Sequence, residues 1–151
     1  MQLTSVYHRL KFLFVEQTLL VIKPDAVARG VIGEIITTIE RAGLKIAGLV
    51  MRRLSRTEAE EFYAIHRGKE FFAGLVEFII SGPVVALLVE GENARQRVRE
   101  LAGATDPARA ADGTLRQRFG SSVRQNAVHA ANPAEDVERE IRFFFGNLSQ
   151  P

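Results

Sequence analysis

The segment 113–129 carries the side chains best suited to do chemistry. It reads Gly-Thr-Leu-Arg-Gln-Arg-Phe-Gly-Ser-Ser-Val-Arg-Gln-Asn-Ala-Val-His, with three arginines and an asparagine before the closing His129. A guanidinium group binds anions with forked hydrogen bonds, an amide can hold a hydroxyl, and an imidazole can attack phosphorus. The segment therefore predicts a phosphoryl-transfer site. The same residues would also suit a surface loop with solvated arginines and a histidine that faces the core.

Arginines are concentrated in the part of the chain that leads to this histidine. Between Glu92 and Asn126 there are seven arginines, no lysine and only four acidic residues. Arginine without lysine suggests bidentate binding of phosphate or carboxylate, although a solvated basic face explains the charge equally well. The net charge of the 151 residues is +2, which is too small to indicate a nucleic-acid partner.

Several kinds of site are excluded by what the sequence lacks. There is no cysteine, which excludes disulfides, thiolate catalysis and cysteine-based zinc sites. The three histidines, His8, His66 and His129, are too scattered to show the spacing of metal ligands. No Walker A or G-x-G-x-x-G sequence occurs. No apolar run approaches the roughly 20 residues that span a bilayer, so no membrane segment is expected.

Residues 1–15 are basic, free of acids and partly apolar. A secretory signal would place its charge before its apolar core and end in small residues, and this segment does neither. We expect a disordered or loosely docked extension here, followed by a single domain over residues 16–151. A targeting peptide is the less favoured alternative.

Apolar runs predict the strands that must position the reactive side chains. Residues 18–23, 45–54 and 84–89 are rich in aliphatic and β-branched residues, and a shorter run ends at His129. The first run ends at Lys-Pro-Asp, because proline cannot continue a central strand. Lys23 therefore stands at a strand end, where functional side chains of sheets often emerge.

Helices are predicted between the strands from apolar residues at helical spacing. We place them over residues 30–43, 58–66 after a Thr57 cap, 71–80, and 94–101 after an Asn93 cap. Phe71 lies near the edge of its apolar stripe, where core packing is the simplest role. A long loop then runs to about Val123, and loops of that length are usually functional or disordered.

The last helix has a clear start signal. Asn132 is a good N-cap, Pro133 suits the first helical position, and Glu135 falls three residues after the cap. Further along, Glu140 falls at the border of the apolar stripe. A half-buried carboxylate one element after His129 is a candidate partner for its imidazole, and a surface glutamate is the alternative.

Once the helical hairpin of residues 58–80 is set aside, the order of elements is βαββαβ, the ferredoxin-like plan. We predict an α+β sandwich with a four-stranded antiparallel sheet covered by helices. The hairpin and a long loop before the last strand are additions to it. Function does not follow from this plan, because many activities share it.

A series of motifs follows in fixed order from residue 16 to residue 145. They read Thr-Leu-Leu-Val-Ile-Lys-Pro-Asp-Ala-Val-Ala-Arg-Gly, Phe-Phe-Ala-Gly-Leu-Val, Ser-Gly-Pro-Val-Val, Glu-Gly-Glu-Asn-Ala, Gly-Ala-Thr-Asp-Pro-Ala, Gly-Thr-Leu-Arg and Asn-Ala-Val-His. With these motifs the chain resembles the nucleoside diphosphate kinases. The resemblance implies ping-pong transfer of the terminal phosphate of a nucleoside triphosphate, usually ATP, to a nucleoside diphosphate. Broad tolerance of bases and sugars is implied as well.

The resemblance also implies a role for each site residue. His129 is the nucleophile through Nδ1 and becomes a phosphohistidine, Glu140 orients its imidazole, and Tyr63 lies nearby. The nucleotide-binding residues are Arg99, Arg116 and Thr105 on the phosphates, Lys23 and Asn126 on the ribose, Phe71, Val123 and Leu75 on the base, and His66 on the phosphate side. Lys23 also lies close to the phosphates and is counted with the catalytic groups.

One stretch departs from the family pattern. After its histidine the family reads His-Gly-Ser-Asp-Ser or His-Ala-Ser-Asp-Ser, whereas this chain reads His-Ala-Ala-Asn-Pro from His129 to Pro133. Ala131 removes a hydroxyl that can hydrogen-bond near the nucleophile, while Asn132 can still cap a helix. We expect a slower enzyme, or a phosphoenzyme of altered stability, and not an inactive protein.

The resemblance implies that Mg²⁺ is carried by the nucleotide phosphates and water, with no protein metal site. It also implies a cytoplasmic homo-oligomer, a tetramer or hexamer built from dimers, with nucleoside di- and triphosphates as ligands and no membrane or specific nucleic acid. A regulatory nucleotide-binding relative with impaired transfer is the alternative, although the nucleophile and phosphate arginines are all present. A ferredoxin-like RNA binder is disfavoured, because the predicted strands are aliphatic and carry few aromatic residues.

Overall fold

A four-stranded sheet organises the chain. The structure is a computed structural model that describes residues 15–146. Its strands are β1 (Val15–Ile22), β2 (Lys45–Arg52), β3 (Val84–Glu92) and β4 (Val128–Ala130), in the order β2-β3-β1-β4. Every neighbouring pair is antiparallel. The ferredoxin-like α+β prediction is therefore confirmed. Of the predicted extension only Val15 falls among the described residues, and it begins β1.

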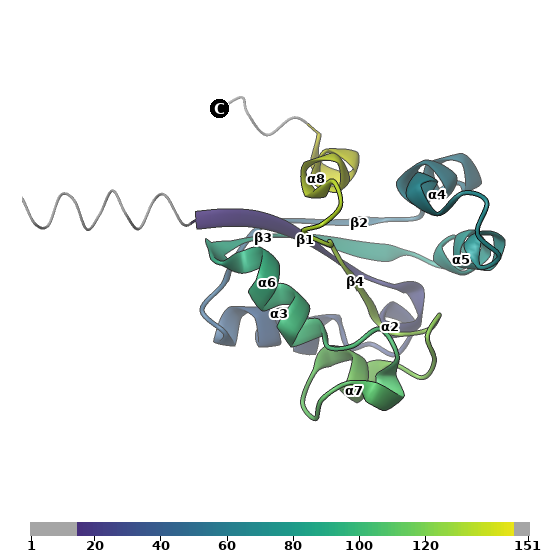
Figure 1. Ribbon diagram of the computed structural model, residues 1–151. Helices are drawn as coiled ribbons and strands as arrows, with labels where there is room; N and C mark the ends of the chain where they lie inside the picture. Colours follow the sequence, from purple (N-terminus) through teal and green to yellow (C-terminus); the bar gives the residue numbers. More distant parts are fainter. Residues whose placement is uncertain (1–14, 147–151) are drawn as a thin grey trace, which may run out of the picture.

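Helices cover both faces of the sheet. Figure 1 views the sheet nearly edge on, with α8 on one side and α3, α6 and α7 on the other. The predicted helical hairpin is present as α4 and α5, which pack against each other. The helices are α2 (Pro24–Ala28), α3 (Ile32–Arg41), α4 (Arg56–Phe62), α5 (Phe72–Ile79), α6 (Ala94–Ala102), α7 (Leu115–Phe119) and α8 (Val137–Phe145), with 3₁₀ turns at Ala64–His66 and Pro107–Arg109.

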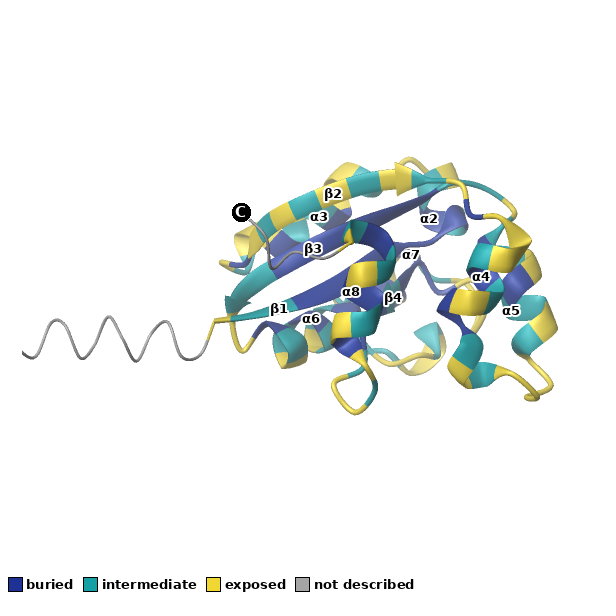
Figure 2. Cartoon of the chain, turned by 90° about the horizontal axis from the view of Figure 1, so that it is seen from above, coloured by how far each residue is buried: buried dark blue, intermediate teal, exposed yellow. Residues whose placement is uncertain are grey.

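The central strands β1 and β3 are buried on both faces, which explains why their sequences are continuous apolar runs. Leu20 and Ile22 belong to the core under α3, α6 and α7, whereas Leu19 and Val21 belong to the core under α4, α5 and α8. Figure 2 shows these two strands as the buried centre of the sheet, while β2 alternates along its edge. The short strand β4 pairs with β1 and brings His129 opposite Val21.

The start of α4 differs from the prediction. Ser55, and not Thr57, is its N-cap: the Ser55 hydroxyl accepts from the backbone N–H of Glu58, and the Glu58 carboxylate accepts from the backbone N–H of Ser55. Both residue types are good caps, and the reciprocal bond with Glu58 favours the serine. The predicted helix also ends early, because a 3₁₀ turn replaces it from Ala64 to His66.

The start of the last helix differs too. The Asn132 side chain accepts from the backbone N–H of Ala134 at 3.0 Å, but it caps only an isolated turn. The helix itself begins at Val137, because Asp136 leaves the helical conformation and its carboxylate accepts from the Arg139 backbone N–H at 3.0 Å. The predicted capping-box role of Glu135 is therefore wrong.

Two further predictions are corrected. Asn93 precedes α6 as expected, but its backbone is left-handed (φ 53°) and its side chain makes no capping bond. The predicted long loop contains ordered elements, namely a 3₁₀ turn and α7, with Thr114 as the N-cap of α7. Short helices such as α7 lack enough turns to show a helical period in the sequence.

Candidate active site

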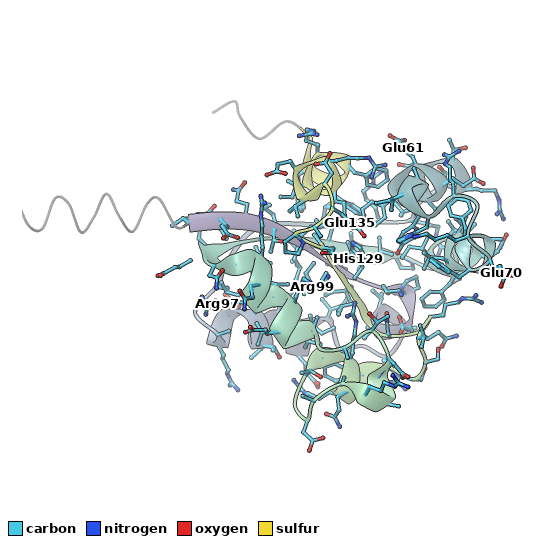
Figure 3. The ribbon with its side chains drawn as sticks, in the orientation of Figure 1. Glu61, Glu70, Arg97, Arg99, His129 and Glu135 are labelled. Atoms are coloured by element: carbon cyan, nitrogen blue, oxygen red, sulfur yellow. The ribbon has the colours of Figure 1, made fainter. Side chains whose placement is uncertain are left out.

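One cavity of about 630 Å³ collects the predicted site residues. Those that line it are Lys23, Tyr63, His66, Phe71, Leu75, Arg99, Thr105, Arg116, Val123, Asn126 and His129. Glu140 lies behind His129, outside this cavity. In Figure 3 His129, Arg99 and Glu135 gather between α8 and α6, whereas Arg97 points to the opposite side of α6.

The His129 imidazole is held from behind. Its Nε2 pairs with Oε1 of Glu140, a carboxylate that is buried on α8. The rings of Phe62 and Tyr63 stand edge-on to the imidazole, with centroids 5.2 and 6.1 Å away. A carboxylate can only accept, so this pairing places the ring proton on Nε2 and leaves the Nδ1 lone pair free. The histidine is thereby prepared for nucleophilic attack through Nδ1.

Tyr63 adds a neutral phenol beside the imidazole. Its ring is buried, and burial raises the pKa of its hydroxyl, as does the nearby Glu140 carboxylate. The phenol therefore stays protonated and can donate a hydrogen bond toward the cavity without adding negative charge there.

Two arginines are fixed on either side of the histidine. Arg99 Nη1 donates to the carbonyl of Ala130 at 3.0 Å, and Arg116 Nη2 donates to the carbonyl of Val128 at 3.0 Å. Arg116 Nη1 also donates to Gly103, at 2.8 Å. Because Val128 and Ala130 flank His129 in β4, the strand that presents this histidine also holds both guanidinium groups.

The pair of arginines favours an anion. Burial, and then the neighbouring Arg99, lower the pKa of Arg116 to about 10, which still leaves it charged at neutral pH. Its buried Nε has no partner among the described residues. Two cations that repel each other gain most from a bound phosphate that both can contact.

A polar chain links Lys23 to the loop after α6. Lys23 Nζ donates to Asn126 Oδ1 at 2.9 Å and to the carbonyl of Arg124 at 2.7 Å. Asn126 Nδ2 in turn donates to the carbonyl of Thr105 at 3.0 Å. Burial lowers the pKa of Lys23 to about 8, with Arg116 and Arg124 adding to the effect and Asp25 opposing it. These groups are rigidly placed to meet hydroxyls and phosphates.

The mouth of the cavity is apolar. Phe71 is 47% exposed and Val123 is 59% exposed, although both are large hydrophobic side chains. They come from the start of α5 and from the loop before β4, and Leu75 lies one turn after Phe71. The His66 ring packs against Phe71 with centroids 5.2 Å apart. Burial, followed by Lys69, lowers the pKa of His66, which favours its neutral form. Exposed apolar side chains over a polar cavity suit a flat aromatic ligand.

Six further residues, to which the sequence assigned no individual role, line the cavity: Ser122, Arg124, Val128, Ala130, Asn132 and Glu135. Asn132 and Glu135 were interpreted only as capping residues. Their positions, three and six residues after His129, were the sequence feature that could have assigned them to the cavity. Arg124 is one of the three arginines of the segment 113–129, but the sequence assigned it no individual role, because a loop arginine is usually solvated.

The described residues show neither a metal-binding cluster nor a membrane-spanning helix. Within residues 15–146 no three histidine, aspartate or glutamate side chains are grouped so as to hold a metal ion. None of the helices in that range has the length and apolar character to cross a membrane.

Comparisons with known proteins agree with one another. The family model for nucleoside diphosphate kinase matches residues 16–149. The nucleoside diphosphate kinase of Paracidovorax citrulli is 54% identical over 135 residues, which cover 89% of this chain and 96% of that relative. The one from Chlamydia pneumoniae is 53% identical over 133 residues, covering 88% of this chain and 92% of that protein.

Solved structures show the same likeness. The crystal structure of the Aquifex aeolicus nucleoside diphosphate kinase has a TM-score of 0.86 and 42% identity, and the match covers 91% of this chain and 99% of that one. The structure of the Halobacterium salinarum nucleoside diphosphate kinase in complex with CDP has a TM-score of 0.85 and 45% identity, covering 87% and 88%.

Proposed function

The chain belongs to the nucleoside diphosphate kinase family, and we propose that it performs that family's phosphotransfer through His129. The protein is an enzyme that binds nucleotides and moves the terminal phosphate of a nucleoside triphosphate to a nucleoside diphosphate. The alternative of a regulatory relative with impaired transfer is not favoured.

In the first half-reaction the Nδ1 lone pair attacks the terminal phosphorus of the triphosphate. The Nδ1–P bond forms, the bond from phosphorus to the bridging oxygen breaks, and the nucleoside diphosphate leaves. In the second half a terminal oxygen of another diphosphate attacks the same phosphorus and Nδ1 leaves, which restores the imidazole. The Glu140 carboxylate supports the attack of Nδ1 in the first half-reaction. Positive charge develops on the ring as the Nδ1–P bond forms, and the carboxylate stabilises this charge through its hydrogen bond from Nε2–H.

The arginines stabilise the negative charge of the transferred phosphoryl group. The transferred phosphoryl group spreads negative charge over its oxygens in a loose transition state, and positioned cations stabilise that charge. Arg99 and Arg116 lie beside His129 in the same cavity, where Thr105 can add a hydroxyl bond. Lys23 and Asn126, already joined by a hydrogen bond, are placed to hold the ribose hydroxyls.

The apolar mouth suits the base. We assign stacking contacts to Phe71 and Val123, with Leu75 alongside and His66 toward the phosphates. Apolar contact reads no donor or acceptor on a base edge, so these stacking contacts alone allow different bases to bind.

Enzymes of this family typically use a divalent metal, and we propose Mg²⁺ bound by the nucleotide phosphates as part of the substrate. The metal would neutralise part of the negative charge of the phosphates. The cavity fits this arrangement, since its lining supplies cations and a single carboxylate, that of Glu135.

We further propose a homo-oligomer built from dimers, tetrameric or hexameric, in the cytoplasm. The edge strand β2 supports this proposal, because Leu49 is 53% exposed and Met51 is 54% exposed on a strand whose outer backbone groups lack a neighbour among the described residues. Open apolar strand edges are usually paired or covered. Sedimentation velocity of the full chain would give the assembly directly.

The experiment that tests the mechanism is brief incubation with γ-labelled ATP and Mg²⁺, followed by a chase with GDP. We expect acid-labile, base-stable label on the protein that passes into GTP, and no label on His129→Ala. The matched control is His66→Ala, which removes a histidine of the same cavity and should still take up label. Nucleotide binding without label in the wild type would contradict the proposal.

A further inference from the structure

Arg124 occupies a position that the mechanism above does not use. Its side chain lines the cavity, and its carbonyl accepts from Lys23 at 2.7 Å. The carbonyl accounts for the one hydrogen bond of Arg124 to a side chain among residues 15–146, and the guanidinium has no hydrogen-bond or ion-pair partner in that range. All five of its N–H donors are therefore available to a ligand or to water.

The guanidinium crosses from the loop before β4 to α5. A Cβ built at Gly74 would lie 2.3 Å from Nη2, 2.5 Å from Cζ and 2.7 Å from Nη1, so the whole group lies against that glycine. Only a residue without a side chain leaves room for it there. The contact places the forked donors of Arg124 on α5, beside the apolar mouth of the cavity.

This contact lies next to the proposed base contacts. Gly74 is three residues after Phe71 and precedes Leu75, so the three share one face of α5 and its start. Val123 precedes Arg124 in the opposite segment. The guanidinium therefore lies beside the space between Phe71 and Val123 that we assign to the base.

We propose that Arg124 reads the edge of the bound base and gives the enzyme a preference for guanine over adenine. Guanine presents two neighbouring acceptors, O6 and N7, which match the two parallel N–H groups of a guanidinium. Adenine presents N7 beside an N6 donor, which meets the same guanidinium with like polarity. The apolar stacking contacts cannot supply this distinction.

This inference rests on the proposed function, since it concerns the nucleotide in the same cavity. The test is the ratio of kcat/KM for GDP to that for ADP, measured with one common phosphate donor. We expect a ratio of about 5 to 10 in the wild type, at the lower end of what a bidentate pair provides because Arg124 is exposed. The ratio should fall to about 1 in Arg124→Ala.

Three additional measurements separate edge recognition from other roles. Arg124→Lys keeps the charge and loses the fork, so it should lose most of the preference. Gly74→Ala keeps the arginine but displaces its guanidinium, and it should lower the ratio as well. IDP, which keeps O6 and N7, should behave like GDP, whereas 7-deaza-GDP should behave like ADP.

Equal rates with GDP and ADP in the wild type, or a ratio that survives Arg124→Ala, would overturn the inference while leaving the kinase intact. A merely structural role of Arg124 would lower both rates together and leave their ratio unchanged, which also overturns it. Failure with every diphosphate would instead contradict the proposed function.

Discussion

The pairing of Glu140 with His129 predicts a graded loss of activity when the carboxylate is changed. Both side chains are largely enclosed, with 7% of Glu140 and 22% of His129 exposed. A hydrogen bond to a charged group contributes about 1.5–3 kcal/mol, against about 0.5–1.5 kcal/mol for a neutral pair. Glu140→Gln keeps an acceptor and loses the charge, so transition-state stabilisation should fall by about 1–1.5 kcal/mol, which is about 5- to 10-fold in kcat/KM.

Glu140→Ala should lose more, because Nε2 then has no acceptor and the proton can move to Nδ1. The full charged bond corresponds to about a 10- to 100-fold loss. The assay is steady-state transfer from ATP to a diphosphate, with phosphoenzyme yield measured in parallel. Glu138→Gln is the matched control, since Glu138 lies on the same helix but pairs with Arg95 at 2.6 Å on its exposed side.

The reasoning would be refuted by either of two results. Wild-type turnover in Glu140→Gln would mean that the negative charge of the carboxylate does not contribute to transition-state stabilisation. Equal losses in Glu140→Gln and Glu138→Gln would mean that the effect comes from the stability of α8 and not from the nucleophile. Thermal unfolding of each variant distinguishes the second case from a real catalytic effect.

Three other predictions follow from particular residues. Ala131 is 1% exposed, and Ala131→Ser restores the hydroxyl that the family has at this position. A hydrogen bond from this hydroxyl contributes about 0.5–1.5 kcal/mol, so turnover or phosphoenzyme yield should rise about 2- to 10-fold. No gain in either quantity would contradict this prediction. Burial lowers the Lys23 pKa from 10.5 to about 8, so the unfolded chain binds the proton more tightly than the folded chain. The free energy of unfolding should therefore rise between pH 8 and 10.5. Urea unfolding at several pH values should show a smaller rise for Lys23→Met. Ser55→Ala should cost about 1 kcal/mol in thermal unfolding, while Thr57→Ala should change little, and the reverse order would restore the cap expected from sequence.

The fold followed from the sequence where burial alone decides structure. The strands β1 and β3 are buried on both faces, so their apolar runs are continuous. Pro24 limits β1, whereas β3 runs through Gly91 to Glu92. The apolar stripe of α8 placed Glu140 only at the border of the buried face, with a surface glutamate as the alternative, and the structure buries it and pairs it with His129. Periodicity is informative in these elements because each has one dominant packing surface.

Local signals were less informative where two residues could do the same work. Ser55 and Thr57 are both acceptable caps, as are Asn132 and Asp136, and intrinsic preference does not separate them. Asp136 prevails because its carboxylate meets the Arg139 N–H at 3.0 Å, which only the folded turn brings within reach. The same limit applies to Arg124, whose role depends on Gly74 fifty residues earlier.

The two arginines of the site come from different helices, but both are anchored on the strand that carries His129. Arg99 and Arg116 come from α6 and α7, yet each donates to a carbonyl next to His129. Docking of these helices on the sheet therefore positions both guanidinium groups relative to His129, and each arginine is oriented before substrate arrives. Preorganised cations of this kind stabilise a loose transition state without reorganising during the reaction. Since both anchors are backbone carbonyls of β4, a shift in the register of that short strand would displace the nucleophile and both guanidinium groups together.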